Sequence, residues 1–336
     1  MFRPTALVLR LTSLGAGLLM LACGGAAVSP TPSPGQRTAL TVSYSEIVAD
    51  ELAPWGAKDG GFFDKNGLDV ELQNISSTNG VPALLSGQVQ IAQIGGSEVI
   101  SAAAGGGDLV IIATLAPVFP YLFMAAKEIT NVDQLKGKKV GISRQGGSAD
   151  IATRAGLQRE GLDPNKDVTI VETGSAANRV AALRAGAIQG GVSQPPETTL
   201  LQQQGFNVLF DLAKLKLPAA NTVVATTGTY LKAHRQVIQL YIDSLIQALA
   251  KERKDKAFTL QVLQKWAKMT DQASLDDSYN FYLHEVFPAY PYPRPEQYAA
   301  AIEVLKPKNP RLQGFDVSKV LDASFVKNAN DRKVGG

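Results

Sequence analysis

Cysteine, histidine, aromatic residues and net charge are all scarce in this sequence. Its 336 residues include one cysteine and two histidines, 7% of them are aromatic, and the formal net charge is +3. A single cysteine excludes a disulfide scaffold, and so small a charge without a basic cluster argues against a nucleic-acid-binding protein. The hydrophobic share of 45% excludes a disordered chain. The length is typical of two domains of roughly 150 residues each.

Signatures of catalysis are also missing. The sequence contains no HExxH, P-loop, GxGxxG or GxSxG pattern, and His234 and His284 neighbour neither each other nor the cysteine. An isolated histidine at such a position is usually a surface or core residue. We therefore predict a protein that is not an enzyme, with no catalytic residue, no metal site and no cofactor.

The first 22 residues have the pattern of an export signal. Arg3 and Arg10 precede an apolar stretch that ends at Ala22, and the only cysteine, Cys23, follows directly. Basic residues, an apolar core and small residues in this order are typical of a secretory signal peptide. The last four residues, Met-Leu-Ala-Cys, resemble the bacterial lipobox, in which the cysteine becomes the lipidated first residue.

This pattern predicts where the protein resides. We expect a signal peptide at 1–22, a lipid on Cys23, and a flexible Pro-rich tether over 23–37. The protein would then be exported and anchored by lipid to the outer face of the cytoplasmic membrane or in the periplasm. The alternative is a plain signal peptide or signal anchor in which the cysteine is incidental.

From residue 40 onward, short β-rich runs alternate with helical patterns. This alternation predicts an α/β fold with parallel sheets. After residue 230 an apolar stripe with helical spacing predicts a long helix over 237–249. The predicted strands cover residues 40–44, 69–74, 91–94, 110–115, 139–143, 168–172, 191–193, 208–212 and 221–227.

Two parts of this pattern resemble each other at a constant offset of 99 residues. Residues 82–98 align with residues 181–197, so that Gly87 matches Gly186 and Glu98 matches Glu197. Each part combines a helix end, a glycine cap, a buried strand and a loop that begins the next helix. The match indicates two similar lobes; the alternative is a chance likeness between α/β units.

The strand at 221–227 is one more than the second lobe needs. We therefore predict that the chain returns to the first lobe, with proline-containing crossings at 116–120 and 217–221. One lobe would comprise residues 38–118 and 221–336, and the other residues 119–220. Two connecting segments make a hinge, and ligands bind in a crevice where strand carboxyl ends meet.

Residues 53–70, which include the run GFFDKNGLDV, resemble a signature of the type 2 periplasmic solute-binding proteins of ABC importers. Segments at 84–92, 135–142 and 182–188 also resemble that family, and the likeness is to its nitrate, sulfonate, taurine and thiamine-pyrimidine precursor group. Membership implies a two-lobe α/β fold with two crossover segments and a ligand cleft between the lobes. It also implies closure about the hinge and delivery of the solute to a membrane permease with its cytoplasmic ATPase.

Four loops at predicted strand ends are candidates for the binding site. Helices begin in or after these loops, and their unpaired N–H groups suit anions and carbonyl or ring acceptors. The resemblance places the family's ligand contacts at the same loops. The candidate ligand-binding residues are Tyr44, Ser45, Trp55, Gly96, Ser97, Arg144, Gly146, Gly147, Ser148, Gln194 and Pro195.

Each candidate also has a structural alternative. Ser97 and Ser148 are good helix N-caps, the glycines suit tight turns, and Tyr44 and Trp55 suit core packing as well as stacking on a flat ligand. In these loops the acids Glu46, Glu98, Asp150 and Glu197 outnumber the one cation, Arg144. That balance disfavours a site for small hard anions and favours a neutral or zwitterionic organic solute.

These observations predict a lipid-anchored, monomeric solute-binding component of an ABC importer. Its partners would be a small organic solute of the sulfonate, taurine, pyrimidine or aromatic-acid type, a permease, and the membrane that holds its lipid. One alternative is a lipoprotein that senses the solute for a membrane receptor, and another is an enzyme of the same fold. A permease and an ATPase encoded beside it would favour transport over sensing.

Overall fold

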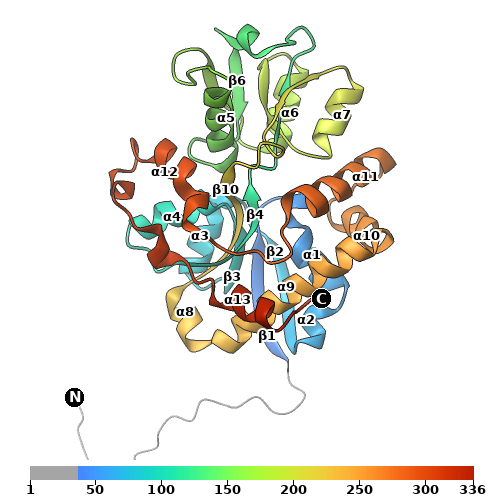
Figure 1. Cartoon of the computed structure of the whole chain (residues 1–336), viewed down its shortest axis with the longest axis vertical. Coiled ribbons are helices and arrows are strands. Elements are labelled where there is room, and N and C mark those ends of the chain that lie inside the picture. Colours follow the sequence, from blue (N-terminus) through green and yellow to red (C-terminus); the bar gives the residue numbers. More distant parts are fainter. Residues whose placement is uncertain (1–36) are drawn as a thin grey trace, which may run out of the picture.

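The structure is a computed structural model that describes residues 37–336. The predicted signal peptide, Cys23 and nearly all of the predicted tether lie outside the described residues. The described chain forms two lobes, one above the other in Figure 1, each built on a five-stranded sheet with helices packed against it. The predicted two-lobe α/β fold is therefore confirmed.

Lobe 1, the lower one in Figure 1, has the strand order β2-β1-β3-β10-β4. β1 (Thr38–Tyr44) pairs in parallel with β2 (Leu68–Asn74) and with β3 (Ile91–Ile94). β10 (Pro218–Thr226) lies antiparallel between β3 and β4 (Val110–Val118). The predicted return of the chain to this sheet is thus confirmed.

Lobe 2 repeats this topology with the order β7-β6-β8-β5-β9. β6 (Lys139–Ile142) pairs in parallel with β7 (Thr169–Glu172) and β8 (Gly190–Ser193). β5 (Leu122–Ala125) lies antiparallel between β8 and β9 (Asn207–Asp211). In each sheet the fourth strand comes from the segment that has just crossed between the lobes. The predicted strand set lacked β5.

Helices connect the strands and cover both sheets. α9 is the longest, and its predicted apolar stripe is buried against α1 and the lobe 1 sheet. A segment with π-helical backbone, Phe281–Val286, follows α11. The helices are α1 (Leu52–Asp59), α2 (Phe62–Lys65), α3 (Ser77–Leu85), α4 (Gly96–Ala104), α5 (Ser148–Arg159), α6 (Ala176–Arg184), α7 (Glu197–Gln203), α8 (Gly228–Ala233), α9 (Arg235–Lys254), α10 (Lys256–Trp266), α11 (Gln272–Asn280), α12 (Ala299–Leu305) and α13 (Ser324–Asp331).

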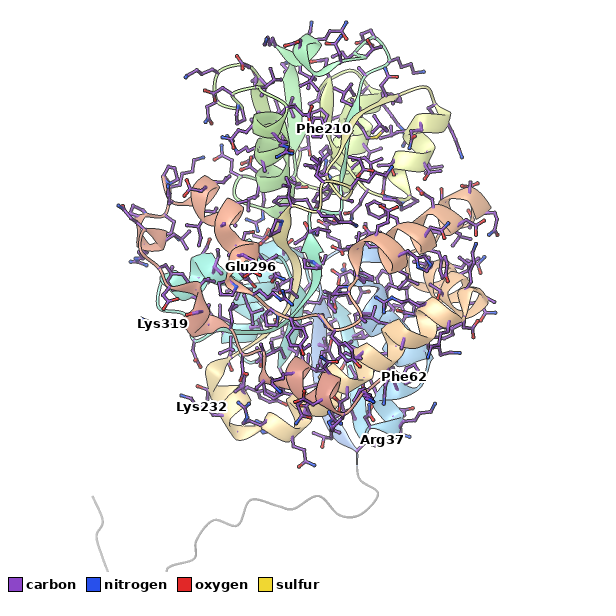
Figure 2. All side chains as sticks on the ribbon, in the orientation of Figure 1. Arg37, Phe62, Phe210, Lys232, Glu296 and Lys319 are labelled. Carbon is purple, nitrogen blue, oxygen red and sulfur yellow. The ribbon has the colours of Figure 1, made fainter. Side chains whose placement is uncertain are left out.

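The two crossings lie side by side and form one packed junction. Val118 at the end of β4 pairs with Pro218 at the start of β10. Phe119 and Tyr121, between β4 and β5, are buried in an apolar cluster that also contains side chains of both lobes. Within lobe 2, Phe210, which is labelled in Figure 2, lies in the upper lobe. Its ring stacks on that of Phe123, with ring centroids 4.8 Å apart. The junction is therefore continuous with both hydrophobic cores.

The C-terminal helices also touch lobe 2. α11 packs against α7, and α12 packs against α5. In Figure 1 these two helices stand on opposite sides of the junction, below the upper lobe. The lobes are consequently held by the crossings in the middle and by a helix contact on each side.

Candidate functional site

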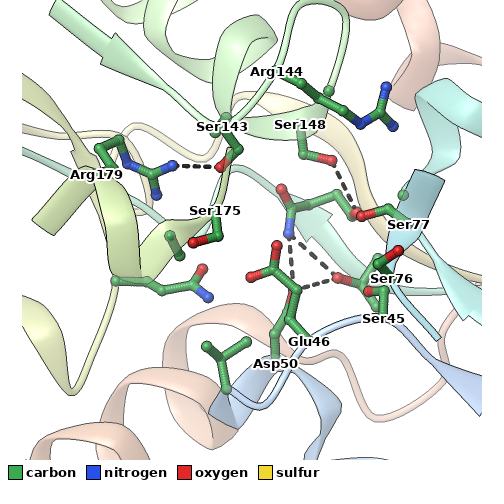
Figure 3. A pocket seen from close by; sticks show the side chains of 18 of the residues that line it. Ser45, Glu46, Asp50, Ser76, Ser77, Ser143, Arg144, Ser148, Ser175 and Arg179 are labelled. Atoms are coloured by element: carbon green, nitrogen blue, oxygen red, sulfur yellow. Dashed lines mark hydrogen bonds between the residues drawn. The ribbon is translucent and has the colours of Figure 1, made fainter. Parts of the chain in front are cut away.

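A cavity of about 370 Å³ lies between the two lobes. Its size falls within the range of small-molecule pockets, which is roughly 300–1,000 Å³. Lobe 1 contributes residues 45–48, 50, 51, 76–78, 95 and 98, lobe 2 contributes residues 143, 144, 147–149, 174–177, 179, 194 and 197, and the junction contributes Tyr121, Asn221 and Thr222. Figure 3 shows side chains from both lobes facing this space.

The positions of these residues follow from the topology. β1 and β3 of lobe 1, like β6 and β8 of lobe 2, end at the cleft, so the loops that follow them meet there. α3, α5, α6 and α7 begin at or beside the cavity, and they direct N–H groups and a partial positive charge toward it. The polar side chains of the site are therefore carried on rigid element ends.

Glu51 organises the loop after β1. One of its carboxylate oxygens accepts hydrogen bonds from Ser45 N at 2.9 Å, from Ser45 Oγ at 2.8 Å and from Glu46 N at 3.3 Å. The other oxygen accepts a hydrogen bond from Gln93 Nε2. Burial and then the charge of Asp50 raise the pKa of Glu51 to about 8. Because its acceptors are occupied, Glu51 shapes the loop rather than facing a ligand.

Asp50 lies at the junction with one carboxylate oxygen occupied and the other free. Its Oδ2 accepts hydrogen bonds from Asn221 Nδ2 at 2.9 Å and from Thr222 Oγ1. Its Oδ1 is buried and has no hydrogen-bond partner among residues 37–336. Burial raises the pKa of Asp50 to about 7, against the opposing effect of the Thr222 hydrogen bond. Near neutral pH this carboxyl can therefore be either a donor or an acceptor.

Arg179 of α6 is the principal cation on the lobe 2 side. Its Nε donates to Val192 O and its Nη1 to Ser143 Oγ, both at 2.6 Å, and the residue is 4% exposed. Glycines in the sheet make room for it, since a Cβ at Gly191 would lie 3.1 Å from Arg179 Cδ. Burial lowers the pKa of Arg179, while Tyr121 and Glu46 raise it.

Two further acids face Arg179 without a hydrogen bond to it. Glu46 and Glu197 are half-buried, and burial raises the pKa of each carboxyl while the charge of Arg179 opposes that rise. In Figure 3, Glu46 from lobe 1 and Arg179 from lobe 2 lie on opposite sides of the same space. The site therefore presents both signs of charge to a molecule between the lobes.

Arg144 and Glu98 form an ion pair across the cleft. Arg144 Nη2 donates to Glu98 Oε1, and Ser97 Oγ donates to Glu98 Oε2 at 2.5 Å. The Glu98 side chain is 10% exposed and the Arg144 side chain 34%. This pair joins lobe 1 to lobe 2 at the edge of the cavity and neutralises the charge of Arg144.

The structure brings five of the predicted site residues to the cavity and leaves six outside its lining. Ser45, Arg144, Gly147, Ser148 and Gln194 line the cavity. Their binding of a ligand stays a prediction. The residues outside the lining are Tyr44, Trp55, Gly96, Ser97, Gly146 and Pro195.

The two aromatic candidates lie in the core of lobe 1. Trp55 is fully buried, stacks on Trp266 with ring centroids 5.9 Å apart, and meets the edge of Tyr44 at 5.5 Å. Both face α10 rather than the cavity because α1 turns its apolar face toward the C-terminal helices. Pro195, after β8, is buried beside Gln194 without lining the cavity.

The remaining candidates have roles in local packing. Gly96 packs against Ala220 of β10, and Gly146 donates its backbone N–H to Asp150 Oδ2 at 2.9 Å. The structural alternative of serine caps is wrong: Gly95 and Gly147 occupy the N-cap positions of α4 and α5. Ser148 instead donates to the backbone oxygen of Asn221 at 3.3 Å.

Several cavity residues were not among the predicted site residues, namely Asp50, Glu51, Arg179, Asn221 and Thr222. Arg179 lies two residues before the aligned segment 181–197, and at the same offset of 99 residues it falls opposite Gly80. An arginine where the other copy has glycine, on a helix beside glycine-containing strands, indicates a side chain that passes over the sheet. The other four lacked any comparable pattern.

Two searches of residues 37–336 gave negative results. No helix there is both long and apolar enough to cross a membrane. Among the same residues, no three histidine, cysteine, aspartate or glutamate side chains are grouped so that they could hold a metal ion.

Comparison with known proteins found one matching family model. The model described as "NMT1/THI5 like" matches residues 55–251, which is more than half of the chain. The matched region includes most of lobe 1 up to α9, and all of lobe 2.

Known sequences and structures resemble the chain at low identity. "Putative binding protein YtlA" from Bacillus subtilis (strain 168) is 24% identical over 221 residues, covering 63% of this chain and 66% of its own length, just under two thirds. The alkanesulfonate-binding protein SsuA from Xanthomonas axonopodis pv. citri, bound to MOPS, is 18% identical with a TM-score of 0.70, and the match covers 86% of this chain and 99% of that one. The periplasmic nitrate-binding protein NrtA from Synechocystis PCC 6803 is 18% identical with a TM-score of 0.72, covering 88% and 89%. The shared architecture is the type 2 periplasmic-binding-protein fold.

Proposed function

The chain belongs to the NMT1/THI5-like family, and on that premise we propose that it is the solute-binding component of an ABC importer. The observation that carries the proposal is the polar cavity between two lobes of like topology. Relatives described as binding proteins share the fold and support the same function. In this proposal residues 38–118 and 221–336 move as one lobe and residues 119–220 as the other.

Binding would occur by closure of the lobes around the solute. The solute would contact lining residues of lobe 1 such as Ser45 and Glu46 and lining residues of lobe 2 such as Gly147 and Ser148, so its full set of contacts exists only when both lobes surround it. A ligand shifts a conformational equilibrium by its differential affinity for the two states. The adjacent crossings, which lie at the end of β4 and the start of β10, supply the hinge.

The proposal also states where the protein resides and which partners it has. The pattern of residues 1–23 supports export and a lipid on Cys23, and mass spectrometry of the mature N-terminal peptide tests both. We propose a monomer that delivers a small organic solute to a permease. If the solute binds but its uptake into cells is unchanged without this protein, solute sensing replaces import as the proposed function.

A thermal-shift screen of the purified protein tests solute binding directly. Sulfonates, nitrate, pyrimidines, amines, amino acids and aromatic acids form the panel. A ligand at 100 times its Kd stabilises a protein by about 2.7 kcal/mol, which is a measurable shift. The screen is repeated with Gly147→Trp, because Gly147 lines the cavity and has an extended backbone that accepts a side chain.

We expect a stabilising solute whose effect is lost in Gly147→Trp and kept in Ser86→Trp, a control at the exposed end of α3. A solute that still binds Gly147→Trp with full affinity would contradict this cavity as the site. A folded, ligand-free protein that no solute stabilises would contradict the solute-binding function itself.

A further inference from the structure

We propose that the solute carries a nitrogen group with several N–H donors, such as an ammonium, amidinium or guanidinium, and that Glu46 and Asp50 bind this group. The inference deepens the proposed function and rests on it, since it names the chemistry that the same cavity selects. It is drawn from the hydrogen-bonding groups that the cavity leaves unpaired and from the charges that surround them.

The first observation is a surplus of unpaired acceptors at the junction. Asp50 and Asn221 line the cavity, and the Oδ1 atom of each is buried without a hydrogen-bond partner among residues 37–336. Asn221 has a fixed orientation because its Nδ2 donates to Asp50 Oδ2, so its free atom is the carbonyl oxygen. Gln194, at the opposite wall, has an equally unpaired Oε1. A solute rich in N–H groups supplies the missing donors.

The second observation is the charge that remains after internal pairing. Arg144 is neutralised by Glu98, and the oxygens of Glu51 accept hydrogen bonds from Ser45 in its own loop and from Gln93 of β3. Glu46 is different: within the described chain its side chain has no hydrogen-bond or ion-pair partner. Glu46 and Asp50 project from the same loop into the same part of the cavity (Figure 3). A cation between them would be bound by both.

Because of Arg179, the nitrogen group accounts for one end of the solute only. Its guanidinium faces the cavity from lobe 2, and its Nη2 donates to no residue of the described chain. An acidic group at the other end of the solute is therefore compatible with the site. A solute with an acidic group alone would leave the acceptors of Asp50 and Asn221 unpaired, and it would meet the charge of Glu46.

Protonation of Asp50 makes the affinity for the cation depend on pH. Asp50 faces Glu46 and Glu51 from its own segment, Tyr121 from the crossing and Tyr282 from the π-helical segment. Its pKa is about 7 in the free protein, so a bound cation must displace its proton. Affinity for the cation should then rise about tenfold between pH 6 and pH 8, since a protonated Asp50 does not bind it. Affinity for an anion should fall over the same interval.

Matched pairs of probes separate the amine from the acid. Taurine is compared with ethanesulfonate, and benzamidine with benzoate and with neutral benzamide, by calorimetry at pH 6 and pH 8. We expect taurine or benzamidine to bind and the probes without the nitrogen group to bind at least about tenfold more weakly. Glu46→Gln should remove this preference, whereas Glu128→Gln, an exposed acid outside the cavity, should keep it.

Asp50→Asn provides a second variant, in which the rise in affinity with pH should become smaller, because the Asp50 carboxyl no longer titrates while those of Glu46 and Glu51 remain. Binding of ethanesulfonate, benzoate or benzamide in preference to the nitrogen-bearing probes would overturn the inference and leave the solute-binding function standing. Unchanged preference in both Glu46→Gln and Asp50→Asn would also overturn it. If no probe of any charge binds, the inference and the proposed function fail together.

Discussion

At the scale of single residues, the most unusual group outside the cavity is Glu252 of α9. The residue is fully buried, and neither of its carboxylate oxygens has a hydrogen-bond partner among residues 37–336. α1 approaches it so closely that a Cβ at Gly56 would lie 1.7 Å from Glu252 Oε1. Burial raises the pKa of Glu252 well above its usual value, and the nearby charge of Arg253 offsets only part of this rise. Glu252 therefore keeps its proton to a higher pH in the folded protein than in the unfolded chain.

This state predicts how stability depends on pH. The unfolded chain ionises Glu252 near pH 4.5, whereas the folded chain ionises it at a higher pH because its pKa is raised. Its contribution to stability is therefore present below pH 4.5 and is lost as the pH rises toward the folded-state pKa. The loss is about 1.4 kcal/mol per pH unit. Glu252→Gln should therefore be more stable than the natural protein at pH 8, with a smaller difference at pH 5.

Urea unfolding at the two pH values measures this difference. Glu160→Gln, at an exposed position after α5, is the matched control and should follow the natural protein at both values. Asp50 and Glu51 contribute a slope of the same sign, because their pKa values are also raised. Comparing variant with natural protein isolates Glu252. An equal destabilisation at pH 5 and pH 8 would mean that the carboxyl makes a contact of its own.

At the scale of secondary-structure elements, hydrophobic pattern was a good guide wherever a strand is long or flanked by glycine. β1, β3, β8 and β10 lie close to their predicted positions because each is a buried run bounded by turn residues. β5 was missed because it has four residues and directly follows a crossing that contains Pro117 and Pro120. Proline there indicates a connection, and nothing local reveals that sheet pairing resumes two residues later.

The same limit explains which site residues could be predicted. Ser45, Gly147 and Gln194 follow strand ends, so topology alone brings them to the cleft. Asp50 and Asn221 meet only because the chain returns across the junction, 171 residues later. A contact of that separation leaves no periodic signal in a single sequence. Local pattern therefore located the cleft, and the partners within it required the fold.

Gly96 shows how an element contact can resemble a ligand contact in sequence. It begins α4 directly after the loop that ends β3, where a glycine would let a ligand approach the backbone. In the structure the neighbour is β10 instead: a Cβ at Gly96 would lie 2.7 Å from Ala220 O and 2.6 Å from Ala220 Cβ. The glycine therefore sets the distance between α4 and the returning strand.

Gly96→Ala should consequently destabilise the protein by about 1–3 kcal/mol, because backbone atoms must move to accept the methyl group. Chemical unfolding measures the loss, and solute affinity measured on the folded variant should change little. The opposite pattern, with normal stability and weakened binding, would restore Gly96 to the predicted ligand contacts.

At the scale of the whole molecule, five polar contacts connect the lobes outside the covalent crossings. They join lobe 2 to α4, to β10 and to the C-terminal segments of lobe 1, so together they oppose separation of the lobes. Each is a single hydrogen bond or ion pair, and when the lobes separate its groups bind water instead. Each contact alone therefore contributes little to the free energy of closure. The contacts are Glu98 with Arg144, Ser148 with Asn221, Thr199 with Asp277, Gln145 with Lys308, and Lys216 with the backbone oxygen of Glu285.

The contact between Thr199 and Asp277 offers the cleanest test of hinge closure, because both residues lie outside the cavity lining. Thr199 of α7 donates its hydroxyl to the carboxylate of Asp277 on α11, so the bond exists only while lobe 2 rests on the C-terminal helices. Thr199→Val keeps the shape of the side chain and removes the donor. Without solute, the variant should favour the open form and have a larger radius of gyration by small-angle X-ray scattering.

Thr229→Val is the matched control, since Thr229 makes the same kind of bond to Asp108 within lobe 1. It should leave the radius of gyration unchanged even if it lowers stability.

Solute binding adds contacts to both lobes, so a saturating solute should return Thr199→Val to the compact dimensions of the natural protein. The affinity of Thr199→Val for the solute should be lower by the same factor as its closed population without solute. The reason is that binding must then supply the free energy of closing the lobes. If Thr199→Val stays compact without solute and binds with full affinity, the α7–α11 contact does not influence closure. If it expands but does not contract with solute, the lobes separate without the hinge motion that the proposed function requires.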